Sequence, residues 1–256
     1  MPQSRRNSDM RIYSMKEEAS CGDCSLSDLC LPVSLDVDKI DALSRIVQRG
    51  RPLQRGDVLY QAGTVFTAIF AVRSGALKST SLSEDGEEQI TAFHLPGEII
   101  GLDAITFGSH PSSAEALETS SLCEIPFNQL EDLATVIPQL QQQLLRVMSR
   151  EIHHEQEMMQ ALARRTAEQR LAIVLLNLSE RFAQRGLSAT RFRLPMSRHD
   201  LSNYLGLAPE TMSRLFKRFV DQDWIVASGR EVQLNDLDAL REMTGNPSLM
   251  ERSSRG

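Results

Sequence analysis

The C-terminal third of the chain decides the fold, because residues 198–222 read RHDLSNYLGLAPETMSRLFKRFVDQ. Apolar residues recur at helical spacing on both sides of Gly206, and Pro209 stands where the first turn of a second helix would begin. These features predict two helices, 198–205 and 209–222, with the short turn that is typical of a helix-turn-helix motif. Two β-prone runs follow, separated by a Ser-Gly-Arg turn, and they predict a hairpin wing.

Positive charge is concentrated around this motif. Residues 191–230 contain seven Lys or Arg and four Asp or Glu, so they carry a net charge of +3, while the whole chain carries −6 and the remainder −9. A chain that is acidic as a whole does not coat nucleic acid or an anionic membrane with its entire surface. A basic face confined to a helix-turn-helix instead predicts contact with double-stranded DNA.

The upstream part of the chain has the pattern of a β domain followed by a long helix. Between residues 56 and 124, short β-prone runs alternate with glycine turns at the spacing of a small jelly-roll. From 139 to 165 a helical pattern runs without a breaker for roughly 40 Å. No run reaches the ~20 apolar residues of a membrane span, and the first 20 residues lack the apolar core of a secretory signal. We therefore expect a cytoplasmic protein that does not associate with a membrane.

One face of the long helix has the 3-4 spacing of a coiled coil, with a single acid among the apolar side chains: Leu145, Met148, Ile152, Glu155, Met159 and Leu162. Packing within the same chain is the commoner role of such a face. The length of the helix and its place between two domains favour a homodimer. Two facing Glu155 carboxylates ~6 Å apart would repel by roughly 3 kcal/mol, unless each turns to solvent or pairs with a neighbouring Arg. We therefore expect marginal dimerisation.

The four cysteines are unevenly distributed. Three lie within ten residues as Cys21-x2-Cys24-x5-Cys30, and Cys123 follows 93 positions later. In a chain kept reduced in the cytoplasm, this pattern indicates metal or redox chemistry rather than disulfides. Four cysteines can hold a 4Fe-4S cluster or a structural zinc ion, and the spacing alone leaves both open. Cys123 by itself would be typical of an inert core cysteine.

The order of these parts, from about residue 21 to residue 240, resembles the Crp/Fnr family of bacterial transcription regulators. The cysteine pattern, the stretch GEEQITAFHL at 86–95 and the helix PETMSR at 209–214 are similar to the FNR/Anr-like branch of that family. The resemblance implies an α+β fold, with an N-terminal double-stranded β-helix (jelly-roll, cyclic-nucleotide-binding-like) domain, a long dimerisation helix and a C-terminal winged helix-turn-helix domain. The expected boundaries are a cluster-binding arm at 1–31, a β-roll sensor domain at 32–138, the dimerisation helix at 139–165, the DNA-binding domain at 166–243 and a flexible tail at 244–256.

The resemblance also implies a function. Cys21, Cys24, Cys30 and Cys123 would hold an oxygen-labile 4Fe-4S cluster, with zinc as the alternative, and a polar arm would keep the cluster accessible. With its cluster intact, the chain would bind palindromic TTGAT half-sites as a homodimer and control anaerobic gene expression. It would be an activator that touches RNA polymerase through exposed loops such as 84–87.

The same resemblance assigns the DNA contacts. Glu210, Ser213 and Arg214 are expected to meet bases, because arginine can bind guanine, glutamate can accept from cytosine, and serine can meet adenine or thymine. An ion pair between Glu210 and Arg214 within the helix is the alternative use of that pair. The expected phosphate contacts, which give affinity without specificity, are Arg198, Lys217 and Arg218.

Two other classes of function are less compatible with the sequence. Family members that bind cyclic nucleotides use a Gly-Glu pair and a later Arg before Ser-Ala; here Gly97-Glu98 is present, but Ser112 stands in place of the Arg. Because phosphate recognition depends on that bidentate cation, we expect no cyclic nucleotide and interpret Gly97-Glu98 as turn structure. An enzyme that uses the cysteines directly would not need a helix-turn-helix, and the chain has no phosphate loop, zincin spacing or nucleophile elbow. We therefore expect no enzymatic activity.

Overall fold

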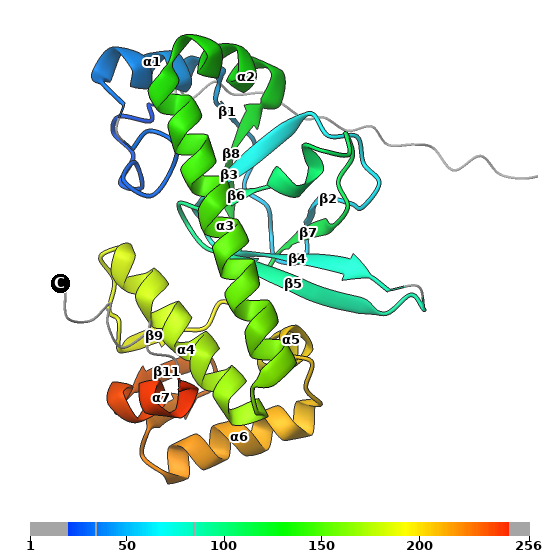
Figure 1. The fold of residues 1–256 in the computed structure, drawn as a ribbon, viewed down its shortest axis with the longest axis vertical. Coiled ribbons are helices and arrows are strands. Elements are labelled where there is room, and N and C mark those ends of the chain that lie inside the picture. Colours follow the sequence, from blue (N-terminus) through cyan, green and yellow to red (C-terminus); the bar gives the residue numbers. More distant parts are fainter. Residues whose placement is uncertain (1–19, 34, 84, 246–256) are drawn as a thin grey trace, which may run out of the picture.

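A computed structural model describes residues 20–33, 35–83 and 85–245, which form a β domain, a long helix and a C-terminal domain (Figure 1). The helices are α1 Val37–Ile46, α2 Phe127–Val136, α3 Pro138–Arg164, α4 Ala167–Gln184, α5 Arg198–Tyr204, α6 Pro209–Asp221 and α7 Leu237–Thr244, with a 3-10 turn at Leu102–Ala104. The strands are β1 Gln48–Arg49, β2 Val58–Tyr60, β3 Ala68–Ser74, β4 Leu77–Leu82, β5 Glu88–His94, β6 Ile99–Ile100, β7 Ser113–Ala116, β8 Ser121–Pro126, β9 Arg191–Arg193, β10 Ile225–Ser228 and β11 Glu231–Leu234. Most of the predicted tail lies outside the described residues.

The β domain consists of two four-stranded antiparallel sheets, in the orders β1-β8-β3-β6 and β2-β7-β4-β5. This arrangement confirms the predicted fold class. Within the β-prone region, the apolar run 65–72 exceeds the strand it contains: β3 starts at Ala68, because Val65 is exposed and forms only an isolated bridge to Ser109. The sequence did not predict β1, β6 and β7, since β1 and β7 contain no β-branched or aromatic residue and β6 has only two residues.

Helix α3 crosses from the β domain to the C-terminal domain (Figure 1). It opens on Pro138, whose missing N–H is not needed at the first helical position, and it runs without a break to Arg164. One face is buried within the chain, through Leu140, Gln143, Val147, Met158 and Ala161. None of the helices among the described residues is long and apolar enough to cross a membrane.

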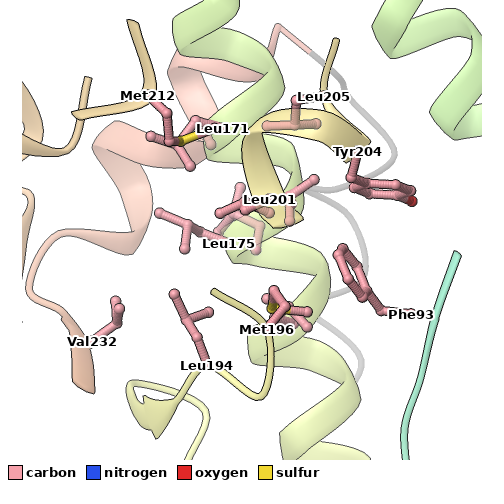
Figure 2. Close-up of a cluster of buried hydrophobic side chains, with 14 of the residues drawn as sticks. Phe93, Leu171, Leu175, Leu194, Met196, Leu201, Tyr204, Leu205, Met212 and Val232 are labelled. Atoms are coloured by element: carbon pink, nitrogen blue, oxygen red, sulfur yellow. The ribbon is translucent and has the colours of Figure 1, made fainter. Parts of the chain in front are cut away.

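The C-terminal domain contains the predicted helix-turn-helix. Ser197 caps α5 reciprocally with Asp200, the chain turns at Gly206 with a φ of +62°, and α6 opens on Pro209. Strands β10 and β11 form the wing hairpin, and β9 pairs with β11. Figure 2 shows the apolar core that holds these elements on α4.

The two domains share that apolar core. The ring of Phe93 on β5 meets the ring of Tyr204 on α5 at a centroid distance of 5.0 Å (Figure 2). Beside these rings, Asn203 of α5 binds the free edge of β5: its Oδ1 accepts from the Ile90 N–H at 2.6 Å, and its Nδ2 donates to the Glu88 carbonyl at 2.8 Å. The first helix of the motif is therefore docked on the edge of the sheet that contains β5.

Candidate functional site

The four cysteines come from two separate parts of the β domain. Cys21, Cys24 and Cys30 lie in the turns of the arm, while Cys123 lies on β8 directly across from Arg49 of β1. All four are half-buried and carry free thiols. The arm is fixed to two helices. The Cys21 N–H donates to the Ser44 hydroxyl of α1 at 2.9 Å, and the arm's other end is bound by α3, where Gln143 Nε2 donates to the Cys30 carbonyl at 3.2 Å.

The four thiols form one electrostatic group. Burial raises the pKa of Cys21, Cys30 and Cys123, that of Cys30 to about 12, and negative charge on neighbouring cysteines raises these pKa values further. Every pair among the four cysteines interacts in this way. If all four thiols lost their protons, a bound positive charge would have to compensate the four thiolates. A metal centre supplies such a charge.

The donor set of four thiols suits, by its chemistry, either a 4Fe-4S cluster or a single zinc ion. Four ligands at about 2.3 Å from one zinc ion would lie roughly 3.8 Å from one another. Among the described residues, no three His, Cys, Asp or Glu side chains converge closely enough to hold one ion. In a cubane, each thiolate binds a different iron, so the four sulfurs surround the cluster rather than meet at a point. The described residues thus contain no closed single-ion site, and the four soft thiol donors are of the kind that iron-sulfur clusters use.

Arg49 is a site residue that the sequence did not reveal. Its positive charge lowers the pKa of Cys123, against the effect of burial, and it acts on Cys21 in the same direction. Its Nε is buried and has no hydrogen-bond partner among the described residues. The pairing of β1 with β8 brings Arg49 to the thiols from 74 positions away in the chain, and nothing in the sequence distinguishes it from other basic residues.

The outer face of α6 presents the residues predicted to read DNA. Glu210, Ser213, Arg214 and Lys217 are exposed, while Met212, Leu215, Phe216 and Phe219 hold the opposite face in the core. Within the described part of the chain, Glu210 and Arg214 form no ion pair, although they lie one turn apart. The Ser213 hydroxyl donates to the Pro209 carbonyl at 3.0 Å and keeps its oxygen lone pairs for another partner. Figure 1 shows α6 at the end of the molecule opposite the β domain.

The predicted phosphate contacts differ in their availability. Lys217 is exposed and has no ion-pair partner in the residues that the structure covers. The Arg198 guanidinium lies over the Phe216 ring, 4.3 Å from its centroid, and Arg218 is paired with Glu168 of α4. Arg218 thus shares its charge with Glu168, while its remaining N–H groups are still available to a phosphate.

The predicted dimer face of α3 is largely open in the single chain. Leu145, Ile152 and Met159 are 55–64% exposed, and Met148 is half-buried. Leu162 instead packs against the core of the C-terminal domain, so the apolar stripe serves both packing within the chain and an outer face. Glu155 is exposed and makes no ion pair with any described residue, which removes the neighbouring-Arg alternative for the isolated chain.

Glu98 has a role beyond the turn structure predicted for it. The loop between β5 and β6 does turn at Gly97, with a φ of +92°. The Glu98 carboxylate, however, accepts hydrogen bonds from Arg181 of α4 and from Arg185, the residue that caps the end of α4. Ser112, which replaces the arginine of cyclic-nucleotide receptors, donates to Asp103 at 2.9 Å. The positions that would bind a cyclic phosphate are thus occupied by contacts within the chain.

The surface loop predicted to touch RNA polymerase is described at 85–87, where it is exposed. Residue 84 lies outside the described residues.

Comparison with known proteins identifies relatives over nearly the whole chain. Residues 50–135 match the cyclic nucleotide-binding domain, and residues 169–243 match the Crp-like helix-turn-helix domain. The chain is 55% identical over 228 residues to the transcriptional activator protein Anr of Pseudomonas protegens, covering 89% of this chain and 93% of the relative. It is 47% identical over 236 residues to the fumarate and nitrate reduction regulatory protein of Escherichia coli K12, covering 92% and 94%.

Among solved structures, the chain is similar to FixK2 from Bradyrhizobium japonicum, with a TM-score of 0.71 and 31% identity over 77% of this chain and 97% of that one.

Proposed function

The chain belongs to the Crp/Fnr family of transcription regulators, and from this premise we propose that it is an oxygen-responsive DNA-binding regulator of the FNR and Anr type. The observation that carries the proposal is the gathering of Cys21, Cys24, Cys30 and Cys123 into one group by the arm and β8. These four residues would hold a 4Fe-4S cluster. The relatives are named as transcription regulators rather than enzymes, and the predicted absence of catalysis agrees with those names.

The cluster, when bound, supplies an oxidisable centre, and the chain's own residues supply its setting. Arg49 places positive charge beside Cys123 and Cys21 and so offsets part of the negative charge of four thiolates. The half-buried thiols and the exposed arm residues between them leave the centre within reach of a small oxidant. Oxygen entering along the arm would therefore meet the cluster without unfolding the domain.

The arm is connected to the proposed dimer helix by a hydrogen bond. Gln143 is buried on α3 and donates to the Cys30 carbonyl, so a change in the arm acts directly on the first half of α3. The face of α3 that carries Leu145, Ile152 and Met159 would pack against the same face of a second copy. Loss of the cluster would release the arm, disturb α3 and return the protein to a monomer.

A dimer is needed because each copy of α6 would contact only one half-site. Two copies of α6, related by a two-fold axis, would enter successive major grooves at TTGAT half-sites. Glu210, Ser213 and Arg214 would meet base edges, and Arg198, Lys217 and Arg218 would meet phosphates. The exposed loop at 85–87 is available for RNA polymerase.

The proposal is tested by the visible absorption spectrum and by iron and sulfide analysis of protein purified without air. We expect a brown protein with about four irons per chain, as an all-cysteine cubane requires, and bleaching when oxygen is admitted. A colourless protein with one zinc per chain would leave a DNA-binding regulator but would overturn its oxygen sensing.

Replacement of Glu155 by alanine should strengthen dimerisation of the protein without its cluster. The expected gain is up to about 100-fold in the dimerisation constant, because two facing carboxylates repel by roughly 3 kcal/mol. Sedimentation velocity over a range of concentrations measures it. Glu157→Ala is the matched control, since Glu157 pairs with His153 at 3.3 Å on another side of the same helix. A Glu155→Ala protein as monomeric as its parent would contradict the role of this face.

A further inference from the structure

Glu98 joins the sensor domain to the DNA-binding domain within one chain. Its Oε2 accepts from Arg181 Nη2 at 2.5 Å, and its Oε1 accepts from Arg181 Nε at 3.0 Å and from Arg185 Nη2 at 2.6 Å. The same arginines also bind the loop's backbone, because Arg181 donates to the Phe93 carbonyl and Arg185 to the Pro96 carbonyl, both at 2.6 Å. Five hydrogen bonds thus fasten the end of α4 to residues 93–98.

This contact is charged and poorly hydrated. The side chains of Glu98, Arg181 and Arg185 are only 22%, 15% and 5% exposed. Burial alone would raise the pKa of Glu98, but the charges and hydrogen bonds of the two arginines outweigh it and lower the pKa to about 2. Removing one partner from such a group is costly, because the remaining charges lose both their solvent and their partner.

The arm packs against the other side of the same loop. A Cβ atom placed on Gly97 would lie 2.8 Å from Cβ of Leu29, which is closer than real side chains approach. Gly97 also has a φ of +92°, a conformation that glycine adopts without strain. Leu29 immediately precedes the cluster ligand Cys30, so one loop contacts the arm through Gly97 and α4 through Glu98.

The loop has room to move. A cavity of about 450 Å³ extends along it and is lined by Leu29, Gly97, Glu98, Val147, Arg181 and Arg185, among others. Because arm, loop, α3 and α4 all border this space, a shift of Leu29 can move the loop without a clash against close-packed atoms.

We propose that Glu98 is a positioning residue for DNA binding, which transmits the state of the arm to α4 and so sets the orientation of the helix-turn-helix on the sensor domain. The inference rests on the proposed function only in that the arm is the sensing element. This route runs within one chain and is separate from the link through Gln143 to the dimer face.

A second ion pair between the domains provides the control. Arg193 of β9 and Glu118 lie 3.2 Å apart, but their side chains are 54% and 37% exposed. Exposed pairs of this kind contribute little, since water and salt screen them. Glu118→Gln therefore removes a carboxylate at the same domain boundary without disturbing the loop.

The test is hydrogen–deuterium exchange of the full chain prepared free of metal, with Leu29→Ala as the perturbation of the arm. In the parent, Leu29→Ala should speed exchange both in the loop at 95–98 and at the end of α4, residues 181–185. Glu98→Gln should itself speed exchange at 181–185 by about tenfold or more. Adding Leu29→Ala to Glu98→Gln should then change the loop alone, while in Glu118→Gln both segments should still respond.

Two results would overturn the proposal: Leu29→Ala leaves 181–185 unchanged in the parent, or it changes them equally with and without the Glu98 carboxylate. If Glu98→Gln does not fold, Arg185→Gln serves in its place, because Arg181 remains paired to Glu98. The exchange experiment needs no cluster, so its outcome is independent of the metal analysis. In protein that carries a cluster, Glu98→Gln should also reduce the ratio of operator affinities measured with and without the cluster, at unchanged iron content.

Discussion

Cys123→Ser is expected to remove the cluster and to reduce affinity for a two-half-site TTGAT duplex by roughly 10²–10⁴-fold. This is the factor by which the affinity of two linked DNA-binding domains exceeds the affinity of one, and a monomer would lose it. Cys123 is the one proposed ligand that lies on β8, so its loss would leave one iron without a thiolate and remove the link that the cluster would make between the arm and β8. Serine is nearly the same size as cysteine, and the loss therefore reports on ligation rather than on packing.

Iron content, the visible spectrum and fluorescence anisotropy without air measure this effect. Iron should fall from about four per chain to nearly none, and the protein should sediment as a monomer. Ser121→Ala, two residues away on the same strand, should retain the cluster and the affinity. A Cys123→Ser protein that keeps its full iron and its operator affinity would show that another group completes the site.

Arg214→Ala is expected to lower affinity for the same duplex by about 1–3 kcal/mol, or 5- to 150-fold, for each half-site at which the guanidinium no longer meets a base. The guanidinium is exposed on α6, and no carboxylate in the described part of the chain pairs with it, so it is available for a bidentate contact to guanine. Its removal should also relax preference at one base pair of the half-site. Duplexes with each base pair replaced in turn, measured by anisotropy, will locate that position.

Lys217→Ala is the matched control on the same face. It should weaken binding to every duplex alike and lower the slope of affinity against salt by about one for each phosphate that is no longer neutralised. If Arg214→Ala and Lys217→Ala have equal effects on all sequences, the assignment of Arg214 to base reading is wrong.

The helices could be predicted closely because their signals are local. The predicted range 139–165 differs from Pro138–Arg164 by one residue at each terminus, and 209–222 differs from Pro209–Asp221 by one residue at its end. Proline at a first turn, glycine at a turn and a capping box all act within four residues. The short strands β1, β6 and β7 depend on distant partners and have no comparable signal.

The same limit applies to the candidate site. Cysteine spacing predicted the four candidate ligands, because residue type and separation along the chain are visible in the sequence. Arg49, Gln143 and the arginine partners of Glu98 come from pairings 74 to 113 positions apart in the chain, so no spacing rule could find them. For Glu98, the neighbouring residues in the sequence predicted only turn structure. Its role depends on α4 folding back beside the β domain.

The contact between Asn203 and β5 has a consequence for the solubility of the β domain. β5 is an edge strand, and an uncovered edge offers a row of free N–H and C=O groups on which another chain can add a strand. The Asn203 amide satisfies one of each, at Ile90 and Glu88, much as a neighbouring peptide group would. The DNA-binding domain thus protects this edge from intermolecular strand pairing, and a sensor domain cut away from α5 would expose a surface through which β proteins polymerise.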